Sequence, residues 1–500
     1  MSPKIRKTTV VLTLAGLSIA ATIVVGNLGS AQSNLPPVTL SFYYPGPGVP
    51  ADLKLIQEAA SAITKQKINA TIELNPIEWG SWAPKMDLMM NSGQSCDVVF
   101  TSFWTGTGFA RYAASGALQP LDALLPQYAP KTLARYTKET WRAAQVGGKT
   151  YAVIHYSGYP AYTGVRVLSS LARKYNLKLS DIRKFADLTP FLAAVKKGEP
   201  GIVPLDPRNS AFSTEVAGFD PVIDPLAIRY NDKSLKVFNM YDSAAFKEAA
   251  ALARRWYQAG FVPTDAVSDD DAEAAYKAGK YAVSLRDFNP FTSVEVKKQY
   301  GFEIVGKSLS PLFKTTNGIT NTMNAVCRSS KNPERALMFL ELVQTDRQLF
   351  NTLANGIEGK HWVFADKANG EIKFPDGVTA QNSGYNPGTP WAFGGNHDLD
   401  LYQPLSTPAD RAALTLARRT TARAKASEAL GFVLNPDSIK TELAQISAIV
   451  KQYADPIKKG LVDPATAIPD LNSRLAQAGL SKVSAEVQRQ LNEWNKTATK

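Results

Sequence analysis

Residues 38–48 read VTLSFYYPGPG, an apolar and aromatic run that glycines and prolines bring to a stop. Such a run is typical of a buried strand that ends in a tight loop. Apolar residues at helical spacing follow over 51–65, and INATIEL at 68–74 alternates as a second strand does. A helix expected from about 81 to 91 leads to DVVF at 97–100, a third short strand. This alternation predicts an α/β unit built on a parallel sheet.

The rest of the chain continues the alternation and then becomes helical. YAVIH at 151–155 and YAVSL at 281–285 are strand-like. Helices are expected in the region between and around these runs, at 165–175, 181–197, 243–259 and 269–279. The α/β pattern resumes over 302–345, a loop-rich stretch follows, and helices dominate after Pro408. Because no low-complexity linker separates independent domains, we expect two lobes between which the chain crosses more than once.

The N-terminus has the parts of a secretory signal peptide. Lys4, Arg6 and Lys7 precede an uncharged apolar stretch, and small residues follow at 29–31. We expect residues 1–31 to be removed on export, which places the mature chain in a periplasm or outside the cell. The alternative is a retained membrane anchor, for which the apolar stretch is near the short limit. No cysteine lies near the cleavage region, so a lipid anchor there is excluded.

Composition excludes several classes of protein. The 500 residues carry a formal charge of +12, but the basic residues are dispersed and the chain is exported, so we expect no nucleic-acid partner. The cysteines are Cys96 and Cys327, and the histidines are His155, His361 and His397. We therefore expect no metal and no cofactor. Cys96 and Cys327 are compatible with a disulfide in the first lobe and equally with two buried thiols.

Sequence motifs of enzymes are missing or incomplete. The chain lacks G-x-S-x-G, H-E-x-x-H and Walker A motifs. Gly46-x-Gly48 resembles the start of a dinucleotide loop, but Pro47 and Pro50 lack the N–H groups that bind pyrophosphate. A glycoside-active enzyme needs two carboxylates across a sugar. Such acids exist, yet no spacing singles out a pair, so this enzyme remains the alternative from another class.

Aromatic and polar side chains gather where the expected strands end. In an open α/β sheet, ligands bind beyond the carboxyl ends of the strands. Aromatic faces pack on sugar rings, and carboxylates and amides bind sugar hydroxyls. We therefore expect a carbohydrate site formed by Tyr44, Glu78, Trp79, Trp104, Thr105, Asp287, Asn289 and Trp391. His155 and Tyr156 lie near an expected crossing between lobes, where a structural histidine is equally consistent with the sequence. Core packing is the alternative for each aromatic residue taken singly.

Several segments, in their order along the chain, carry a resemblance to a known family. They are the opening VTLSFYYPGPG, SGQSCDVVF (92–100), YAASGALQPLDALL (112–125), GGKTYAV (147–153), NGIEGKHW (355–362), NSGYNPGTPW (382–391) and LNSRLAQAGLSKVSAEVQRQLNEW (471–494). The chain resembles bacterial extracellular solute-binding proteins of ABC importers, in the subgroup with a further C-terminal domain of unassigned function. Many relatives carry a lipidated cysteine, which this sequence lacks.

The resemblance implies a fold and a function. The fold is α/β, a two-lobed periplasmic-binding-protein fold of type II, with a hinge of several crossings and a helical C-terminal region. We expect a non-catalytic monomer that captures a sugar or oligosaccharide between the lobes and passes it to the permease of an ABC transporter. A binding protein for peptides or another small solute is the alternative. The expected segments are a signal peptide (1–31), lobe I (32–149), lobe II (150–285), hinge return and lobe I (286–345), and lobe II with the helical region (346–500).

Overall fold

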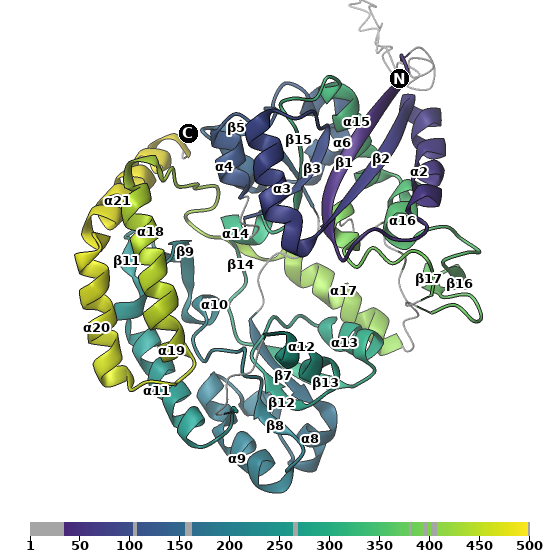
Figure 1. Ribbon diagram of the computed structural model, residues 1–500. Coiled ribbons are helices and arrows are strands. Elements are labelled where there is room, and N and C mark those ends of the chain that lie inside the picture. The colour runs from purple at the N-terminus through teal and green to yellow at the C-terminus, as the bar shows by residue number, and fades with distance from the viewer. Residues whose placement is uncertain are drawn as a thin grey trace, which may run out of the picture.

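The computed structural model describes residues 35–103, 108–155, 163–263, 269–379, 382–394, 399, 401 and 408–498. Two α/β lobes lie one above the other, and a helical C-terminal region flanks both on one side (Figure 1). The predicted signal peptide and retained-anchor alternative fall outside the described residues. Among the residues described, no helix is long and apolar enough to cross a bilayer.

The first lobe is built on a five-stranded sheet with the order β2-β1-β3-β15-β6. Its strands are β1 (Val38–Gly46), β2 (Ala70–Glu78), β3 (Val98–Thr101), β15 (Met323–Val326) and β6 (Ala152–Ile154). Strand β1 runs parallel to β2 and β3, whereas β15 is antiparallel to β3 and β6. The carboxyl ends of β1, β2, β3 and β6 therefore share one edge of the sheet. The predicted first three strands and the strand at 151–155 are confirmed.

Helices from both ends of the chain cover this sheet. They are α2 (Leu53–Ile68), α3 (Trp79–Ser92), α4 (Phe109–Ala114), α5 (Leu125–Tyr128), α6 (Pro130–Arg135), α7 (Lys138–Trp141), α15 (Pro333–Thr345) and α16 (Arg347–Asn355). One hydrophobic core joins Phe42 of β1, Ile56 of α2, Phe339 of α15 and Phe350 of α16. Helix α16 thus packs in the first lobe, whereas the sequence assigned residues from 346 onward to the second.

The second lobe is built on a four-stranded sheet with the order β13-β7-β12-β8. Its elements are β7 (Gly164–Leu168), β8 (Val203–Leu205), β12 (Tyr281–Ser284), β13 (Ile304–Ser308), α8 (Ser169–Lys174), α9 (Thr189–Gly198), α11 (Ala244–Gln258), α12 (Asp269–Lys277) and α13 (Thr292–Tyr300). The helix predicted over 165–175 is wrong in its first turn, because Val165 and Val167 are buried strand residues on both sides of Arg166. Since β13 pairs with β7, the return to the first lobe begins after Ser308.

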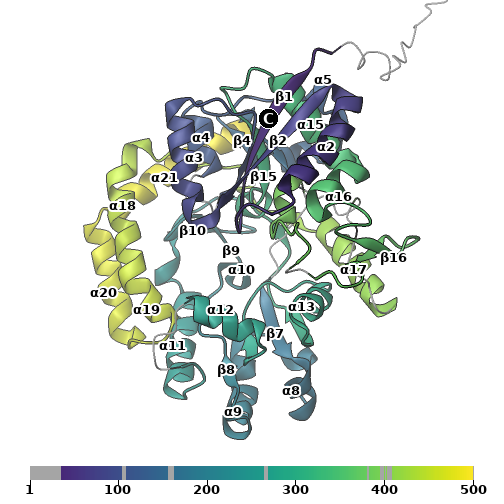
Figure 2. The ribbon, with the colours of Figure 1, turned by 45° about the vertical axis from the view of Figure 1, so that its right-hand side comes forward.

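A third body joins a small sheet to the C-terminal helices. It contains β9 (Phe219–Ile223), β10 (Leu226–Arg229), β11 (Phe238–Asn239), α10 (Thr214–Ala217), α18 (Lys440–Ile449), α19 (Asp455–Lys458), α20 (Pro464–Gln477) and α21 (Leu480–Ala498). Helices α18 to α21 form the outer layer on the left of Figure 1, and α18 to α20 remain at the left in Figure 2. The prediction of a helical C-terminal region is confirmed.

The lobes are joined by several chain crossings, as the sequence predicted. One crossing leads from β6 to β7 and another from β13 to β15. Between the lobes, β14 (Phe313–Lys314) pairs with β18 (Lys425–Ala426). Helix α17 (Pro408–Ala422) packs through Leu414 on Phe291 of the second lobe. Its Arg411 forms an ion pair with Glu371 of the hairpin β16 (Val363–Asp366) and β17 (Glu371–Lys373).

The two cysteines, whose state the sequence left open, form a disulfide. Cys96 and Cys327 lie at the ends of the neighbouring strands β3 and β15, with their Cα atoms 5.7 Å apart. Both residues are buried in the first-lobe core. The bond links residues 231 positions apart and thereby ties the returning chain to the N-terminal part of this lobe.

Candidate functional site

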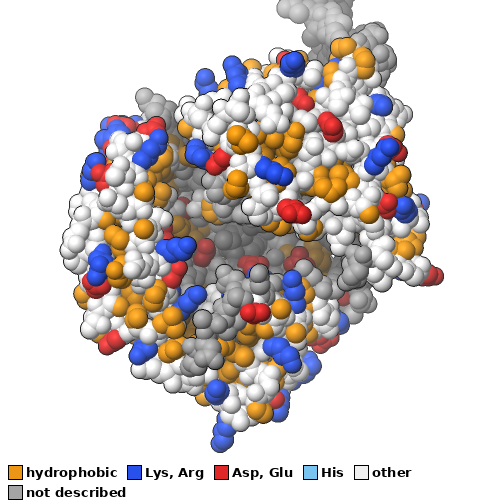
Figure 3. All heavy atoms as spheres, viewed as in Figure 1, with side chains coloured by type: hydrophobic (Ala, Val, Ile, Leu, Met, Phe, Trp, Pro, Cys, Tyr) orange, Lys and Arg blue, Asp and Glu red, His pale blue; other side chains and the backbone are white. Residues whose placement is uncertain are grey.

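The surface is deeply hollowed between the two lobes (Figure 3). The first lobe meets this hollow with the carboxyl-end edge of its sheet, where β6 ends and the first crossing begins. Two aromatic side chains stand exposed here: Trp79, which directly follows β2 and is 41% exposed, and Phe103, which follows β3 and is 45% exposed. Apolar side chains that gather in an exposed patch are a common feature of ligand-binding grooves.

A second tryptophan reaches the same edge from a distant part of the chain. The ring centroids of Trp79 and Trp391 are 6.0 Å apart, with the ring planes inclined by 30°. On its other side Trp391 meets Phe100 of β3 edge-on, at 5.4 Å. Its short helix, Pro390–Phe393, is held on β1 because the Thr389 hydroxyl donates a hydrogen bond of 2.9 Å to the carbonyl of Pro45. We call this pair of neighbouring rings, of which Trp79 is exposed and Trp391 partly buried, the aromatic platform.

His155 holds the Trp391 part of this platform through a hydrogen bond. Its Nδ1 lies 3.0 Å from the carbonyl oxygen of Trp391. Because a carbonyl only accepts, Nδ1 carries the proton and donates it. The ring is fully buried, which lowers the pKa of His155 to about 3, although the bond to Trp391 opposes the shift. His155 is therefore neutral near pH 7 and holds the Trp391 loop through this hydrogen bond.

The second lobe presents charged groups at its own carboxyl-end edge. The guanidinium of Arg166 donates to the backbone carbonyl of Asp287 at 2.7 Å and to its carboxylate at 2.8 Å. It also donates to the hydroxyl of Tyr276 at 3.0 Å. The Asp287 side chain is nevertheless 72% exposed. Its second carboxylate oxygen is thus positioned by a buried arginine and remains available to a ligand.

Next to this edge is a cavity of about 430 Å³ that the sequence analysis missed. It lies between the second-lobe sheet, α10, the β9–β10 hairpin and α19. Its lining mixes apolar residues, such as Phe212 and Met240, with polar ones, which are Thr163, Arg208, Asn209, Ser213, Glu215, Asp224, Tyr241, Arg286 and Lys458. Thr163 lies at the second-lobe end of the crossing from β6, and Arg286 lies beside it because its carbonyl accepts the N–H of Gly164 at 2.9 Å, so the cavity borders the interlobe region. Only the unpredicted strand β8, which ends just before Asp206, could have indicated Arg208 and Asn209 in advance.

Charge in this cavity is nearly balanced. Arg208 donates two hydrogen bonds to the fully buried carboxylate of Asp206, at 3.0 and 2.7 Å. Glu215 accepts hydrogen bonds from the hydroxyls of Ser213 at 2.8 Å and Thr163 at 3.3 Å. Such a set of oriented donors and acceptors, with little net charge, suits a ligand rich in hydroxyl groups.

Two of the predicted site residues have other roles. Tyr44 is only 1% exposed and packs on Phe393, with ring centroids 4.7 Å apart. Its position in β1 has the same parity as Leu40 and Phe42, so its side chain points into the core. Asn289 closes the turn before α13, since its side-chain oxygen accepts from the backbone N–H groups of Phe291 and Thr292 at 2.7 and 3.1 Å. Tyr44 therefore faces the core of the first lobe and not the hollow, and the side-chain oxygen of Asn289 is engaged by the backbone.

The remaining predicted residues fall into two groups. Glu78 is exposed at the end of β2, beside Trp79, in the position that the sequence indicated. Trp104, Thr105 and Tyr156 lie outside the described residues. Among the predicted ligand residues, the structure thus brings Glu78, Trp79 and Trp391 to one edge and places Asp287 on the other lobe.

The NGIEGKHW segment braces the N-terminus of α2. Nδ1 of His361 accepts the backbone N–H of Ile357 at 2.9 Å, so Nε2 is protonated and donates to Asp52 at 3.1 Å. Lys360 lies 3.0 Å from the same carboxylate. Hydrogen bonds from these two side chains lower the pKa of Asp52. The segment is therefore structural.

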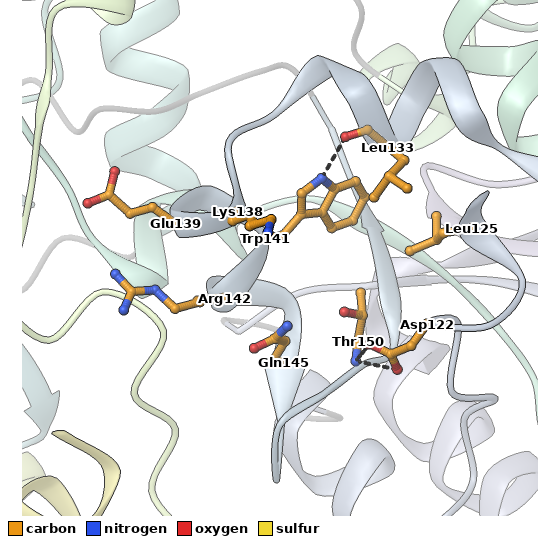
Figure 4. Close-up of a pocket in the computed structure, with 9 residues that line it drawn as sticks. All are labelled: Asp122, Leu125, Leu133, Lys138, Glu139, Trp141, Arg142, Gln145 and Thr150. Carbon is orange, nitrogen blue, oxygen red and sulfur yellow. Dashed lines mark hydrogen bonds between the residues drawn. The ribbon is translucent and has the colours of Figure 1, made fainter. Parts of the chain in front are cut away.

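A further hollow of about 450 Å³ lies on the first lobe alone (Figure 4). Trp141 forms part of its wall and donates from its indole nitrogen to the carbonyl of Leu133 at 3.0 Å. Asp122 accepts the backbone N–H of Thr150, which precedes β6. This part of the hollow is therefore at the amino end of β6, away from His155 and the platform. Within the described residues, no group of three or more potential ligands that could hold a metal ion is found.

Known proteins with a similar sequence or structure match nearly the whole chain. A curated carbohydrate ABC transporter substrate-binding protein of Streptococcus pneumoniae is 26% identical over 498 residues, which cover 97% of each chain. The crystal structure of the N-glycan transport solute-binding protein NgtS from Streptococcus pneumoniae has a TM-score of 0.81 at 24% identity, covering 92% of this chain and 99% of that one. The FusA substrate-binding protein of S. pneumoniae, in complex with kestose, has a TM-score of 0.61 at 16% identity, covering 92% and 100%. These likenesses confirm the predicted two-lobed fold.

Two family models match separate parts of the chain. Residues 428–496 match a domain of unknown function, DUF3502. Residues 48–349, which include every strand of the two lobe sheets except β1, match the bacterial extracellular solute-binding protein model. As its fold and its interlobe hollow already indicate, the chain belongs to the bacterial extracellular solute-binding protein family.

Proposed function

We propose that this protein captures an oligosaccharide between its lobes for uptake by an ABC transporter. The observation that carries the proposal is the platform of Trp79 and Trp391 on the first lobe, at the edge where the chain crosses to the second lobe and its cavity with polar groups. Aromatic faces on one side and hydroxyl-binding groups on the other are the two requirements of sugar recognition.

The ligand in this proposal is an uncharged sugar chain. Arg208, Arg286 and Lys458 line the cavity together with Glu215 and Asp224, and buried Asp206 neutralises Arg208. The net positive charge of the whole chain therefore does not extend to the site. The names of similar proteins support this choice, since NgtS was solved with Man1GlcNAc and Man5GlcNAc, and FusA with kestose.

The family consists of transporter components and not of enzymes, which removes the glycoside-active alternative. Within the proposal, the protein acts as an exported monomer, periplasmic or secreted, after loss of residues 1–31. Closure of the lobes on the sugar creates the form that the permease recognises.

A thermal-unfolding screen tests the proposal. Residues 32–500 are mixed with Man1GlcNAc, Man5GlcNAc, kestose, a galacturonate trimer as the acidic sugar, and tripeptides. A ligand at a hundred times its Kd adds about 2.7 kcal/mol of stability, which such a screen detects. We expect a rise with a neutral oligosaccharide that is recovered uncleaved. A rise with tripeptides alone would overturn the ligand class, and cleavage of the sugar would overturn the transport role.

Variants of the platform then locate the site. Trp391→Ala and Trp79→Ala remove the aromatic faces, and each should weaken binding of the sugar at least tenfold, about 1.4 kcal/mol. Trp494→Phe on α21, whose ring packs on Phe432 at 5.9 Å, is the control far from the platform. Unchanged affinity in Trp391→Ala and Trp79→Ala would show that the sugar binds elsewhere.

A further inference from the structure

The C-terminal region matched as a domain of unknown function is not a separate appendage. Its residues Ile446, Leu471 and Leu491 belong to the same hydrophobic core as Phe219 and Leu226 of the small sheet β9–β10–β11. All five are nearly inaccessible to solvent. Because the two parts of the chain share one core, neither can fold or move independently of the other.

A continuous helix connects this shared core to the second lobe. Helix α11 contributes Phe246 to the core of the C-terminal region and Trp256 to the core of the second-lobe sheet. In both views of the ribbon, α19 lies beside α11 (Figures 1 and 2). The C-terminal helices are therefore held in a fixed position relative to the sheet that bears the cavity.

The turn after α19 is held especially closely. The guanidinium of Arg254 on α11 donates to the carbonyls of Gly460 and Leu461, at 3.1 and 3.2 Å. Gly460 has a φ of +74°, and a Cβ atom there would lie 2.3 Å from the carbonyl oxygen of Ala253. Only glycine permits this approach. The end of α19 is thus fixed against α11 by contacts that need these particular residues.

This anchored helix end places Lys458 in the wall of the cavity. The Lys458 ammonium lies 5.1 Å from the ring centre of Tyr241, and the Tyr241 hydroxyl donates to Asp224 at 3.0 Å. The ion pair of Lys458 with Asp455 is long, at 3.5 Å, and the lysine side chain is 24% exposed. Its three N–H donors are therefore only partly used by the protein.

We propose that the C-terminal domain of unknown function forms one wall of the solute pocket and that Lys458 donates hydrogen bonds from it to sugar hydroxyls. The inference rests on the proposed function and deepens it, because it assigns a ligand contact to a region outside the solute-binding family match. Lys458 is one side of a polar surface completed by Asp224 and Tyr241. A sugar that reaches this cavity from the hollow between the lobes meets all three together.

Isothermal titration with Man5GlcNAc and with kestose tests the inference on the complete mature chain. Lys458→Met keeps the length of the side chain and its packing on Tyr241 but removes the charge and the donors. Lys459→Met changes the next residue, which is exposed and does not line the cavity. We expect the Kd for the sugar that binds wild type to rise at least tenfold in Lys458→Met and by less than twofold in Lys459→Met.

The outcomes separate the two proposals. If wild type binds a sugar and Lys458→Met binds it equally well, Lys458 is not a ligand contact and the inference is wrong while the proposed function stands. If wild type binds neither sugar, the proposed function fails and the inference fails with it. A loss of affinity common to Lys458→Met and Lys459→Met would also overturn the inference, since it would reflect charge at a distance and not contact.

Discussion

The imidazole of His155 donates a hydrogen bond of 3.0 Å to the backbone carbonyl of Trp391, a residue 236 positions further along the chain. This bond joins the end of β6 to the loop that carries half of the aromatic platform. The platform is consequently held by the core of the first lobe. The protonation state of His155 is therefore linked to the position of Trp391.

The burial of His155 predicts a dependence of stability on pH. Its pKa is about 3 in the folded protein, below the ordinary value of 6.5. Between these values the unfolded chain binds a proton that the folded chain does not, so the free energy of unfolding falls as the pH is lowered. Through this residue, lowering the pH from 7 to 5 should reduce the free energy of unfolding by about 2 kcal/mol. Urea unfolding of wild type and His155→Gln at both pH values measures the effect.

In His155→Gln the same decrease in pH should lower the free energy of unfolding by about 2 kcal/mol less than it does in wild type. Asp220 contributes with the opposite sign, because burial raises its pKa to about 6 and the folded chain retains a proton longer. Its contribution is common to both proteins and cancels in their difference. An equal pH dependence in wild type and His155→Gln would contradict the prediction.

Because Thr389 donates a hydrogen bond to Pro45, we predict that this bond keeps Trp391 in its place in the platform. Thr389→Val keeps the shape of the side chain but leaves the buried Pro45 carbonyl without this donor, at a cost of about 1–2 kcal/mol. Sugar affinity should fall a few-fold, because Trp391 is then less firmly placed. Chemical unfolding and calorimetric titration measure the two effects. Thr352→Val, which removes a hydroxyl bond within α16, is the control and should leave affinity unchanged.

The contact between Gly460 and α11 predicts that this glycine couples the C-terminal helices to the cavity. Gly460→Ala should destabilise the protein and weaken sugar binding, since its Cβ would collide with the backbone of Ala253. Gly116→Ala is the matched control, because Gly116 also has a positive φ, of +76°, but open space around it. The two variants share the backbone strain and differ in the collision. Equal melting temperatures for both would show that the contact at Gly460 is unimportant.

The disulfide predicts a large stability difference between oxidised and cysteine-free protein. Replacing Cys96 and Cys327 together by alanine should lower the free energy of unfolding by about 2–5 kcal/mol. Sugar affinity should not change, because both cysteines lie in the core and away from the platform. Alkylation with iodoacetamide under denaturing conditions checks the bond directly. Labelling of unreduced protein would mean that the thiols are free.

Local pattern alone was enough for much of the fold. The run VTLSFYY, the alternation at 68–74 and the strand YAVIH are encoded by neighbouring residues, and each became a strand of the first-lobe sheet. The error at 165–168 has a local cause as well, since a short buried strand directly before a helix has no distinct helical or alternating period. The position of Trp79 at the carboxyl-end edge could be predicted because it directly follows a strand, and parallel strands end at a common edge.

What the sequence by itself determined is therefore most of the strands and helices, the two-lobed α/β class and the edge of the sheet at which we propose that a ligand binds. Tertiary structure decided which side chains face that edge. Tyr44 points inward because of its parity in β1, whereas Trp391 joins Trp79 through a loop fixed by Thr389 and His155. Lys458 reaches the cavity only because a shared core docks the C-terminal helices on the second lobe. The local pattern of apolar residues indicates which side chains of a segment are buried. Contacts between residues hundreds of positions apart arise only when the packed core brings them together.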